Sequence, residues 1–470
     1  GLIKCVRRFE WKGDRELDSV NLSVKWQIEK ENCEGFIPGL LYYGNPSEAK
    51  NRPGWVPEFS GTPGEKILVE EHRLPMPFVT LENKQGDNYF GTSLFTLPSP
   101  VPGASRQDMW WSAGLISHKD YAELVLMTGP VSYNGRDGMV KATQSKPLEY
   151  GDTWITVRPG TIIEKTFYLD IYPLKKKGTA FQKAVYNSLE IFKPYYAEDL
   201  PGFKDIMKEK YRFAKSRWIE NDSLAGFNMY PDFSKEMIVM GWCGQAASPG
   251  YALQVSEHMI DDPLISAYIQ KSLDHVSESP VKDTGFPVRY SPENNRWSSP
   301  DHVSQGQGLY NMGMAIRYAR ENGGYNTEKW ENFFLSASNV HAKRILDKKW
   351  YPRSTAEAFY IAPLTIAYKL YGNKLFYDAA TKATDHFAER HLSMEEPYWG
   401  GTLDARGEDK EGAWAAFQGF LYAYEMTGSL NYLDFAKHAL DVCLSYVVVW
   451  DIPLPPGRMT DHAFKTRGWT

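Results

Sequence analysis

The sequence predicts an amino-terminal antiparallel β region followed by a carboxy-terminal array of helical hairpins. Short alternating segments separated by Gly, Pro, Asn and Asp occupy the chain from residue 1 to about 172. After Pro201 the apolar residues recur at helical spacing instead. In this helical region a hairpin pattern recurs about every 50 residues, which is typical of stacked supersecondary repeats.

The length of the chain favours two domains. Its 470 residues exceed the usual size of a single hydrophobic core. We expect an antiparallel β-sandwich over residues 1–172, a helical linker over 173–200 and a helical domain over 201–470. The segment 1–11 reads like a strand, and further strands are predicted at 19–28, 66–71, 76–83, 88–97, 109–117, 121–127 and 161–172.

Nine helices are predicted after the linker. They cover residues 203–220, 250–260, 263–277, 302–322, 326–347, 355–370, 374–390, 411–426 and 430–447. Three hairpins are anchored on Tyr318, Tyr368 and Tyr424, each followed by a turn of a few residues. Because nine is an odd number and the chain stops at Thr470, we expect that a carboxy-terminal segment of a closed ring is missing.

The charge and hydropathy of the chain disfavour two classes of partner. A net charge of −5 and an isoelectric point near 6.1 give no basic surface for nucleic acid. No apolar run approaches the length of a membrane span. Because the sequence begins without Met, we expect that a signal peptide was removed or was not included.

Neither a metal nor a cofactor is expected. Cys5, Cys33, Cys243 and Cys443 are far apart and form no CxxC pair or other metal-ligand spacing. The acidic segment 404–412 resembles a calcium loop, but its spacing departs from the EF-hand pattern. The glycines near residue 307 do not form a phosphate-binding GxGxxG motif.

Long connections are expected at one end of the helical array. The hairpin turns are short, whereas residues 221–245, 278–301, 348–354 and 393–409 form long segments rich in charged and aromatic residues. In a stack of antiparallel hairpins these segments lie at the same end. Long loops on a rigid scaffold commonly carry function, so that end is the candidate site.

The repeated phrases at 412–440 and 361–384 resemble those of the six-hairpin glycosidase superfamily. The resemblance covers residues 201–470 by repeat pattern and the first domain by the order of its elements. It implies an (α/α)6-type toroid, a β-sandwich before it, and a polysaccharide-derived oligosaccharide as the partner. A periplasmic or extracellular location is expected with it.

Carboxylates at the starts of inner helices are the candidate catalytic groups, because glycoside hydrolysis uses a pair of them about 5 Å or about 6.5–9.5 Å apart. Asp409 and Glu411 rank first, with Asp301 second and Glu357 the most ambiguous. Each has a structural alternative. Asp409 and Asp301 suit helix caps, Glu411 suits the helix dipole, and Glu357 fits a capping box.

Aromatic, amide and basic residues on the same loops are the candidate sugar-binding groups. Tryptophans offer faces for stacking, and the 14% aromatic content exceeds what a core alone requires, although core packing remains the alternative for each one. Arginines suit a uronic acid carboxylate, with surface ion pairing as the alternative. The candidates are Trp242, Gln245, Arg289, Trp297, His302, Gln305, Arg353, Trp399, Arg406 and Trp414.

Three functions remain open. Hydrolysis of a glycosidic bond is favoured. A lyase or epimerase acting on uronates would use Tyr or His as its base beside an Arg or Asn, and Tyr310, His302 and Arg289 are available for that role. A glycan-binding protein without catalytic activity is the third.

Overall fold

The computed structural model describes residues 1–29, 33–43, 59–104, 109–129, 138–140, 147–149, 154–195, 201–222, 224–229, 237–241, 247–352, 355–393 and 410–470. The chain forms two compact units. Unit 1 contains residues 1–196, 390–413 and 438–470, and unit 2 contains residues 197–389 and 414–437.

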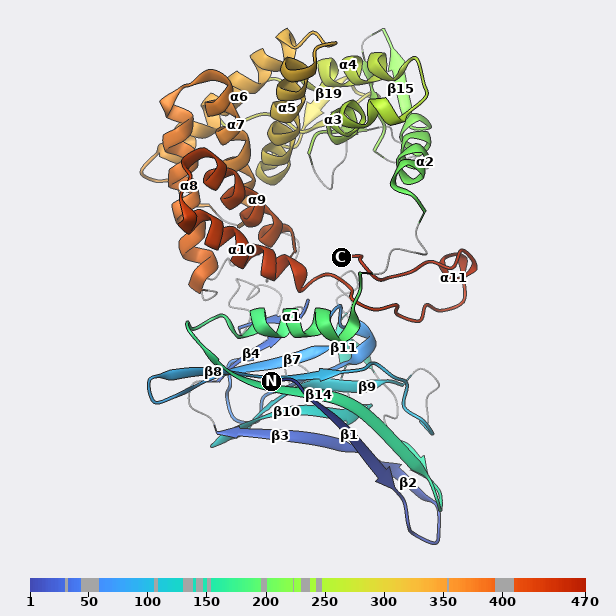
Figure 1. Ribbon diagram of the computed structural model, residues 1–470. Helices are drawn as coiled ribbons and strands as arrows, with labels where there is room; N and C mark the ends of the chain where they lie inside the picture. The colour runs from blue at the N-terminus through green and yellow to red at the C-terminus, as the bar shows by residue number, and fades with distance from the viewer. Residues whose placement is uncertain are drawn as a thin grey trace. The chain divides into compact units, whose positions relative to one another are not determined.

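Two antiparallel sheets form most of unit 1 (Figure 1). The six-stranded sheet has the order β1 (Ile3–Glu10), β14 (Ile162–Leu174), β8 (Asn88–Thr96), β7 (Phe78–Gln85), β4 (Glu34–Ile37) and β5 (Leu41–Tyr42). The four-stranded sheet has the order β3 (Ser23–Glu29), β10 (Tyr121–Thr128), β9 (Trp111–Ser117) and β6 (Lys66–Glu70). Thus β1 and β3 are both edge strands.

Strand alternation divides the six-stranded sheet into two buried faces. In β7, Val79 and Leu81 belong to the main hydrophobic core together with Leu124 of the other sheet. Because side chains alternate along a strand, Phe78 and Thr80 point to the opposite face. Both faces of this sheet are therefore covered in its middle.

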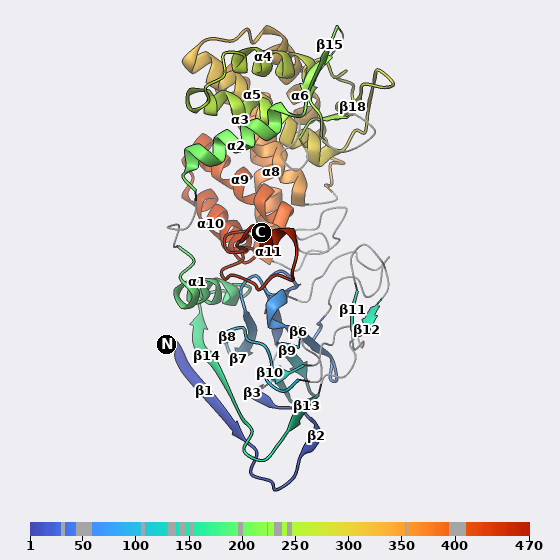
Figure 2. The same ribbon diagram turned by 90° about the vertical axis from the view of Figure 1, so that its right-hand side faces the viewer.

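The helix α1 (Ala180–Phe192) lies along β7 and β8 in both views (Figure 1 and Figure 2). Its Phe181 ring stacks on Phe36 at 4.9 Å. Backbone N–H groups of Gly178 and Ala180, at its amino end, donate to Glu82 at 2.7 and 3.2 Å. Aromatic packing and a carboxylate at the helix amino terminus thus fix α1 on the sheet.

Residues from the far end of the chain complete unit 1. Tyr42 stacks on Tyr446 at 5.3 Å, and its hydroxyl is 2.6 Å from Ser445 Oγ. Asp441 accepts hydrogen bonds from Gln182 and Tyr186 of α1, both at 2.9 Å. Unit 1 therefore needs residues separated by several hundred positions.

Unit 2 is built mainly from helices. These are α2 (Phe203–Lys215), α3 (Ala247–Ser256), α4 (Ile265–Val276), α5 (His302–Asn322), α6 (Glu328–Leu346), α7 (Ile361–Tyr371), α8 (Lys374–Ser393), α9 (Lys410–Thr427) and α10 (Leu430–Leu444), of which the last three extend beyond unit 2. Each predicted helix has a counterpart, and α5 has the predicted bounds.

The three predicted hairpins are present as α5–α6, α7–α8 and α9–α10. Glycines with positive φ end the first helix of each pair. The N–H of Gly372 (φ 67°) donates to Tyr368 O, and that of Gly428 (φ 72°) donates to Tyr424 O. These glycines allow turns of only a few residues, which sets the two helices antiparallel.

Short strands in unit 2 were not predicted. The predicted helix 203–220 is wrong at its end, because residues 218–221 form β15 (Trp218–Asn221), which pairs with β16 (Leu224–Phe227). A second small sheet has the order β17 (Ile238–Val239), β18 (Arg289–Ser291) and β19 (Arg296–Ser298). Cross-strand pairing overrode the local helical pattern.

Smaller elements complete the description. They are β2 (Leu17–Val20), which pairs with β13 (Ile155–Val157), the pair β11 (Gly138–Val140) and β12 (Pro147–Glu149), the 3-10 helices η2 (Glu71–Arg73), η3 (Glu257–Met259) and η4 (Thr355–Tyr360), and α11 (Arg458–Asp461). None of the described helices is long and apolar enough to span a bilayer.

The predicted order of an antiparallel β region and then a helical region is confirmed. The finer assignments to a β-sandwich family and a closed (α/α)6-type ring stay predictions, as do the boundaries at 172, 200 and 470.

Candidate functional site

Buried polar side chains gather in unit 2 where α5 begins, α6 ends and η4 precedes α7. We call this group the α5 cluster. Its members are His302, Gln305, His341, Arg344, Glu357 and Tyr360.

Local hydrogen bonds fix the first turn of α5. Asp301 caps the helix, because its carboxylate accepts hydrogen bonds from the N–H groups of Val303 and Ser304, both at 3.3 Å. The Ser304 hydroxyl donates to the same carboxylate at 2.5 Å. One turn further, Gln305 Oε1 accepts from the Phe286 N–H at 3.2 Å. The cap and this contact set the direction of the His302 and Gln305 side chains.

A glycine allows the loop before β18 to approach the cluster. Gly285 has φ 109°, and a Cβ placed there would lie 2.0 Å from Gln305 Oε1 and 3.0 Å from His341 Cε1. A side chain at this position would collide with Gln305 and would adopt a strained backbone conformation. The predicted loop 278–301 is thereby brought onto α5 and α6.

Tyr360 is the centre of the cluster. Its hydroxyl is 3.2 Å from His302 Nδ1. The His341 ring lies 4.3 Å from the Tyr360 ring, and Arg344 Cζ lies 5.0 Å from its centre. Arg344 Nη1 donates to Glu357 Oε2 at 3.0 Å. These contacts form a continuous series. It runs from the carboxylate of Glu357 through the guanidinium of Arg344 and the phenol of Tyr360 to the imidazole of His302.

Burial shifts two of these groups toward their neutral forms. It raises the pKa of Tyr360 well above the ordinary value, a shift that Arg344 opposes and that Glu357 and Asp301 reinforce. Burial also lowers the pKa of His341 well below its usual value, and the charges of Arg344 and His302 add to that shift. At neutral pH Tyr360 is therefore protonated and His341 uncharged.

Several buried polar atoms of the cluster have no hydrogen-bonding partner among the described residues. They are both ring nitrogens of His341, Gln305 Nε2, and Nε and Nη2 of Arg344. The Tyr360 ring beneath the guanidinium partly compensates Arg344. An unsatisfied buried group costs about 1–3 kcal/mol, so this arrangement is poor for stability alone. Such departures are expected at functional sites.

The exposed edge of the cluster consists of His302 and Arg344. His302 is half-buried, and the Arg344 side chain is 24% exposed, whereas Tyr360 and His341 are buried. The partial exposure of Arg344 therefore does not include Nε and Nη2 of its guanidinium, which are buried.

The other predicted site residues lie in varied places. Arg289 lies in β18, and Trp297 in β19 stacks on His275 at 5.8 Å. Trp414 of α9 is 49% exposed beside Phe417. Glu411 lies half-buried in the first turn of α9 and belongs to unit 1. The predicted residues Asp409, Trp242, Gln245, Arg353, Trp399 and Arg406 lie outside the described residues.

Of the predicted residues, the structure brings His302, Gln305, Asp301 and Glu357 together. Asp301 has the cap role that was the alternative for it, and Glu357 pairs with Arg344. Sequence reasoning missed His341, Arg344 and Tyr360. The predicted α5–α6 hairpin could have indicated His341 and Arg344, because antiparallel pairing places the end of α6 beside the start of α5.

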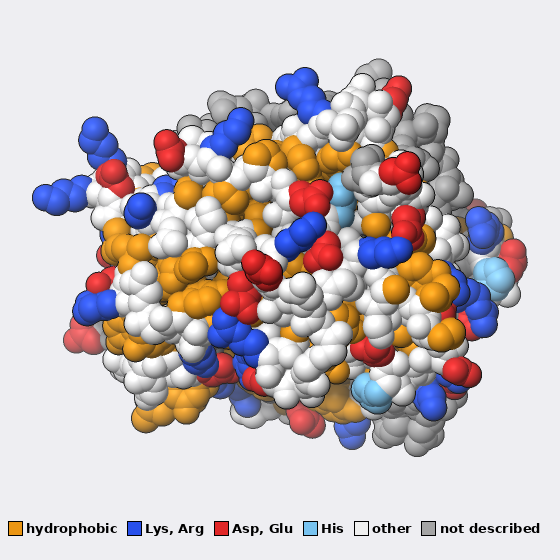
Figure 3. Space-filling view, turned by 90° about the horizontal axis from the view of Figure 1, so that it is seen from above, with side chains coloured by type: hydrophobic (Ala, Val, Ile, Leu, Met, Phe, Trp, Pro, Cys, Tyr) orange, Lys and Arg blue, Asp and Glu red, His pale blue; other side chains and the backbone are white. Residues whose placement is uncertain are grey.

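A second buried polar group lies in unit 1, where Lys165 Nζ is 2.7 Å from Glu71 Oε1 and also donates to Leu97 O and Ser99 Oγ. On the face seen in Figure 3, acidic and basic side chains are interspersed, with hydrophobic side chains between them. Within the described stretches of the chain, no group of three or more His, Cys, Asp or Glu residues is placed to hold a metal ion.

No protein-family model and no curated protein matches the chain. Among solved structures it is similar to a polysaccharide lyase at 9% identity and TM-score 0.24, covering 88% of this chain and 83% of that one. A TPR-domain containing protein from Parabacteroides distasonis matches at 8% identity and TM-score 0.16, covering 97% and 69%. A protein described as a kojibiose phosphorylase from the human microbiome matches at 9% identity and TM-score 0.18, covering 94% and 70%. TM-scores this low do not establish a common fold.

Proposed function

We propose that the α5 cluster is the active site of a carbohydrate-active enzyme that cleaves a uronic-acid-containing polysaccharide by β-elimination. The observation that carries this proposal is the contact of half-buried His302 with buried Tyr360, beside Arg344. Elimination needs a base that removes the proton next to the sugar carboxylate, and a cation that stabilises the charge developing on that carboxylate.

His302 is the proposed base. When its Nδ1–H donates to the Tyr360 oxygen, Nε2 is the acceptor nitrogen, as a general base requires. Nε2 takes the proton from carbon 5 of the uronate, the C4–O4 bond breaks and a C4–C5 double bond forms. The same proton then passes from Nε2 to the departing oxygen, so that no water is consumed.

Tyr360 and Arg344 have supporting roles in this proposal. Tyr360 is a positioning residue in this proposal, because it is buried and, by accepting the Nδ1–H hydrogen bond, would keep Nε2 of His302 unprotonated. Arg344, whose buried Nε and Nη2 have no partner among the described residues, pairs in this proposal with the substrate carboxylate and stabilises the enolate-like charge. Glu357 positions Arg344 through their 3.0 Å hydrogen bond.

Glycoside hydrolysis is the second candidate. The observation that favours it is that two carboxylates lie at the cluster: Asp301 caps α5 directly before His302, and Glu357 accepts a hydrogen bond from Arg344 at 3.0 Å. Hydrolysis uses such a pair as acid and base. We place it second because Asp301 is engaged as a helix cap and Glu357 by Arg344. Catalysis by Glu411 with Asp409 belongs to this candidate.

The decisive test is incubation with polygalacturonate, alginate, hyaluronan and neutral galactan, followed by ultraviolet absorbance and mass spectrometry. Elimination yields an unsaturated uronide that absorbs in the ultraviolet. Hydrolysis yields products heavier by one water without new absorbance, and this outcome would replace the first candidate with the second.

Variants identify the site. His302→Ala should abolish elimination, and Tyr360→Phe should reduce kcat about 100-fold or more, in the range for a general base that is lost or misplaced. His258→Ala, an exposed histidine of unit 2, is the matched control. Wild-type turnover by His302→Ala would exclude this cluster.

A further inference from the structure

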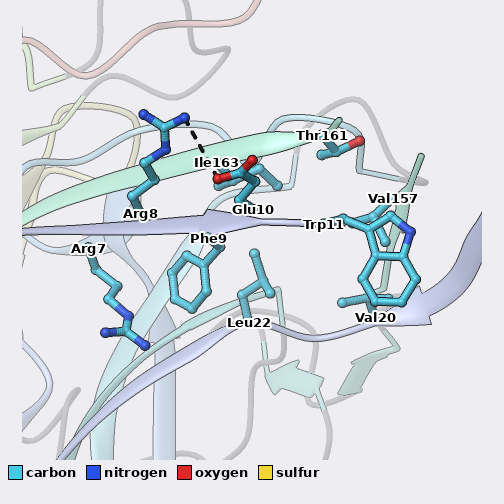
Figure 4. Close-up of a pocket in the computed structure, with 10 residues that line it drawn as sticks. All are labelled: Arg7, Arg8, Phe9, Glu10, Trp11, Val20, Leu22, Val157, Thr161 and Ile163. Atoms are coloured by element: carbon cyan, nitrogen blue, oxygen red, sulfur yellow. Dashed lines mark ion pairs between the residues drawn. The ribbon is translucent and has the colours of Figure 1, made fainter. Parts of the chain in front are cut away.

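The open edge between the two sheets of unit 1 contains two adjoining cavities. One has a volume of about 290 Å³ and is lined by Phe9 and Trp11 (Figure 4). The other has a volume of about 360 Å³ and is lined by Trp26 and Phe167. Arg7 lines both, so we treat them as one site and call it the edge groove.

Arg7 brings a positive charge into the edge groove. In Figure 4 Arg7 and Phe9 lie on one side of β1, and Arg8 and Glu10 lie on the other. Arg8 is 4.0 Å from Glu10 and 3.9 Å from Glu164. Arg7 is exposed, contacts the Phe9 ring at 5.5 Å and has no carboxylate partner among the described residues. Its charge is therefore available to a ligand.

Aromatic side chains lie on both sides of this charge. Trp26 of β3 is 39% exposed, an unusual position for a tryptophan on the side of its strand that carries the buried Ile28. Lys25 pairs with Glu123 at 3.1 Å instead of adding a second uncompensated charge. Leu94, Phe167 and Leu169 form an apolar floor. The groove thus combines flat apolar surfaces with one unpaired guanidinium.

We propose that the edge groove binds an anionic polysaccharide chain, as a site separate from the α5 cluster. Sugar rings present apolar faces that pack on aromatic rings, and a guanidinium binds a sugar carboxylate in bidentate fashion. Each cavity is near the lower end of the roughly 300–1,000 Å³ of ligand sites, and two side by side suit successive sugar residues. The function is to hold a long chain, whatever reaction unit 2 performs.

An extended peptide strand is the rival occupant, because β1 and β3 are both edge strands. Pairing of a strand with β1 would satisfy backbone groups but would leave the Arg7 charge unpaired. An acidic sugar chain satisfies Arg7 and covers Trp26. The charge of the groove therefore favours the polysaccharide.

The test is calorimetric titration of the full chain bearing His302→Ala, so that the ligand is not consumed, with polygalacturonate and with its fully methyl-esterified form. Binding of the acid but not the ester is expected. Arg7→Gln and Trp26→Ala should each weaken binding about tenfold. Lys4→Gln is the matched control, because Lys4 is an exposed cation on the opposite side of β1 and lines neither cavity.

Three results would overturn the proposal. Equal losses of affinity in Arg7→Gln and Lys4→Gln would indicate non-specific electrostatic attraction. A chain that is dimeric by light scattering, and monomeric after Trp26→Ala, would make the groove an interface between copies. No binding of polygalacturonate, alginate or hyaluronan would also contradict it. Absence of turnover on these polymers would contradict the function proposed for the α5 cluster and would leave the proposal for the edge groove unaffected.

Discussion

At the scale of single residues, a substitution of His341 should have different effects on stability and on turnover. It is fully buried and neutral, and neither ring nitrogen has a partner among the described residues. We predict that His341→Leu leaves the free energy of unfolding unchanged or raises it by about 1 kcal/mol, because the unsatisfied nitrogens are removed. Turnover should fall, because His341 packs on Tyr360. A urea titration and an elimination assay measure the two effects.

The opposite pattern for His341→Leu, with lower stability and full activity, would show that the α5 cluster is only a structural core. His275→Leu is a useful comparison. His275 is also buried in unit 2 and has a lowered pKa because of burial, but it packs on Tyr290 and Trp297, away from Tyr360. It should leave turnover intact.

The contacts of Asp262 predict that the free energy of unfolding of unit 2 depends on pH. Lys215 and Tyr211 bind its carboxylate at 2.5 Å, and with the Leu264 N–H they lower its pKa to about 2. An unfolded Asp has a pKa near 3.9. The ionised Asp262 carboxylate therefore stabilises the folded state fully above about pH 5. This stabilisation is lost as the pH falls through 3.9 toward 2.

Asp262→Asn should consequently lower the urea midpoint of unfolding at pH 6, and the gap from the wild type should shrink toward pH 3. The effect is small, because Lys215 is exposed and solvent screens the pair. Asp261→Asn at the exposed neighbouring position is the control. A gap that is independent of pH would contradict the assignment.

At the scale of elements, the cap of α5 supports the α5 cluster. Asp301→Ala should cost about 1 kcal/mol, because two backbone N–H groups and the Ser304 hydroxyl lose their acceptor. Asp301→Asn should retain most of the stability, since Asn caps as well as Asp does. Thermal unfolding of the two variants checks this, and equal losses in both would show that the charge, not the cap, matters.

Elements that depend on local signals could be predicted from the sequence, and contacts between distant elements could not. Apolar spacing and glycines such as Gly372 are local signals, so the helices and hairpins were predicted closely. His302 and Gln305 were found because they follow a visible helix start. His341, Arg344 and Tyr360 were missed because their meeting depends on the pairing of α5, α6 and η4 in space. Likewise, β15 forms only because it pairs with β16.

At the scale of the whole molecule, unit 1 is discontinuous in sequence. We predict that a fragment of residues 1–196 binds a hydrophobic dye and is rapidly proteolysed. It lacks Tyr446, Ser445 and Asp441, which contact Tyr42 and α1 in the full chain. The full chain is the control. A fragment with native near-ultraviolet circular dichroism and no dye binding would show that these contacts are dispensable.

The interleaving of the units has a consequence for synthesis on the ribosome. About 240 residues separate the first segment of unit 1 from the segment that begins at His438. At about 5–20 residues per second, their translation takes roughly 12–48 s. For that time Tyr42 and one side of α1 remain without their final contacts. A chaperone that shields nascent aromatic surfaces would therefore act on the beginning of this chain until its end has been made.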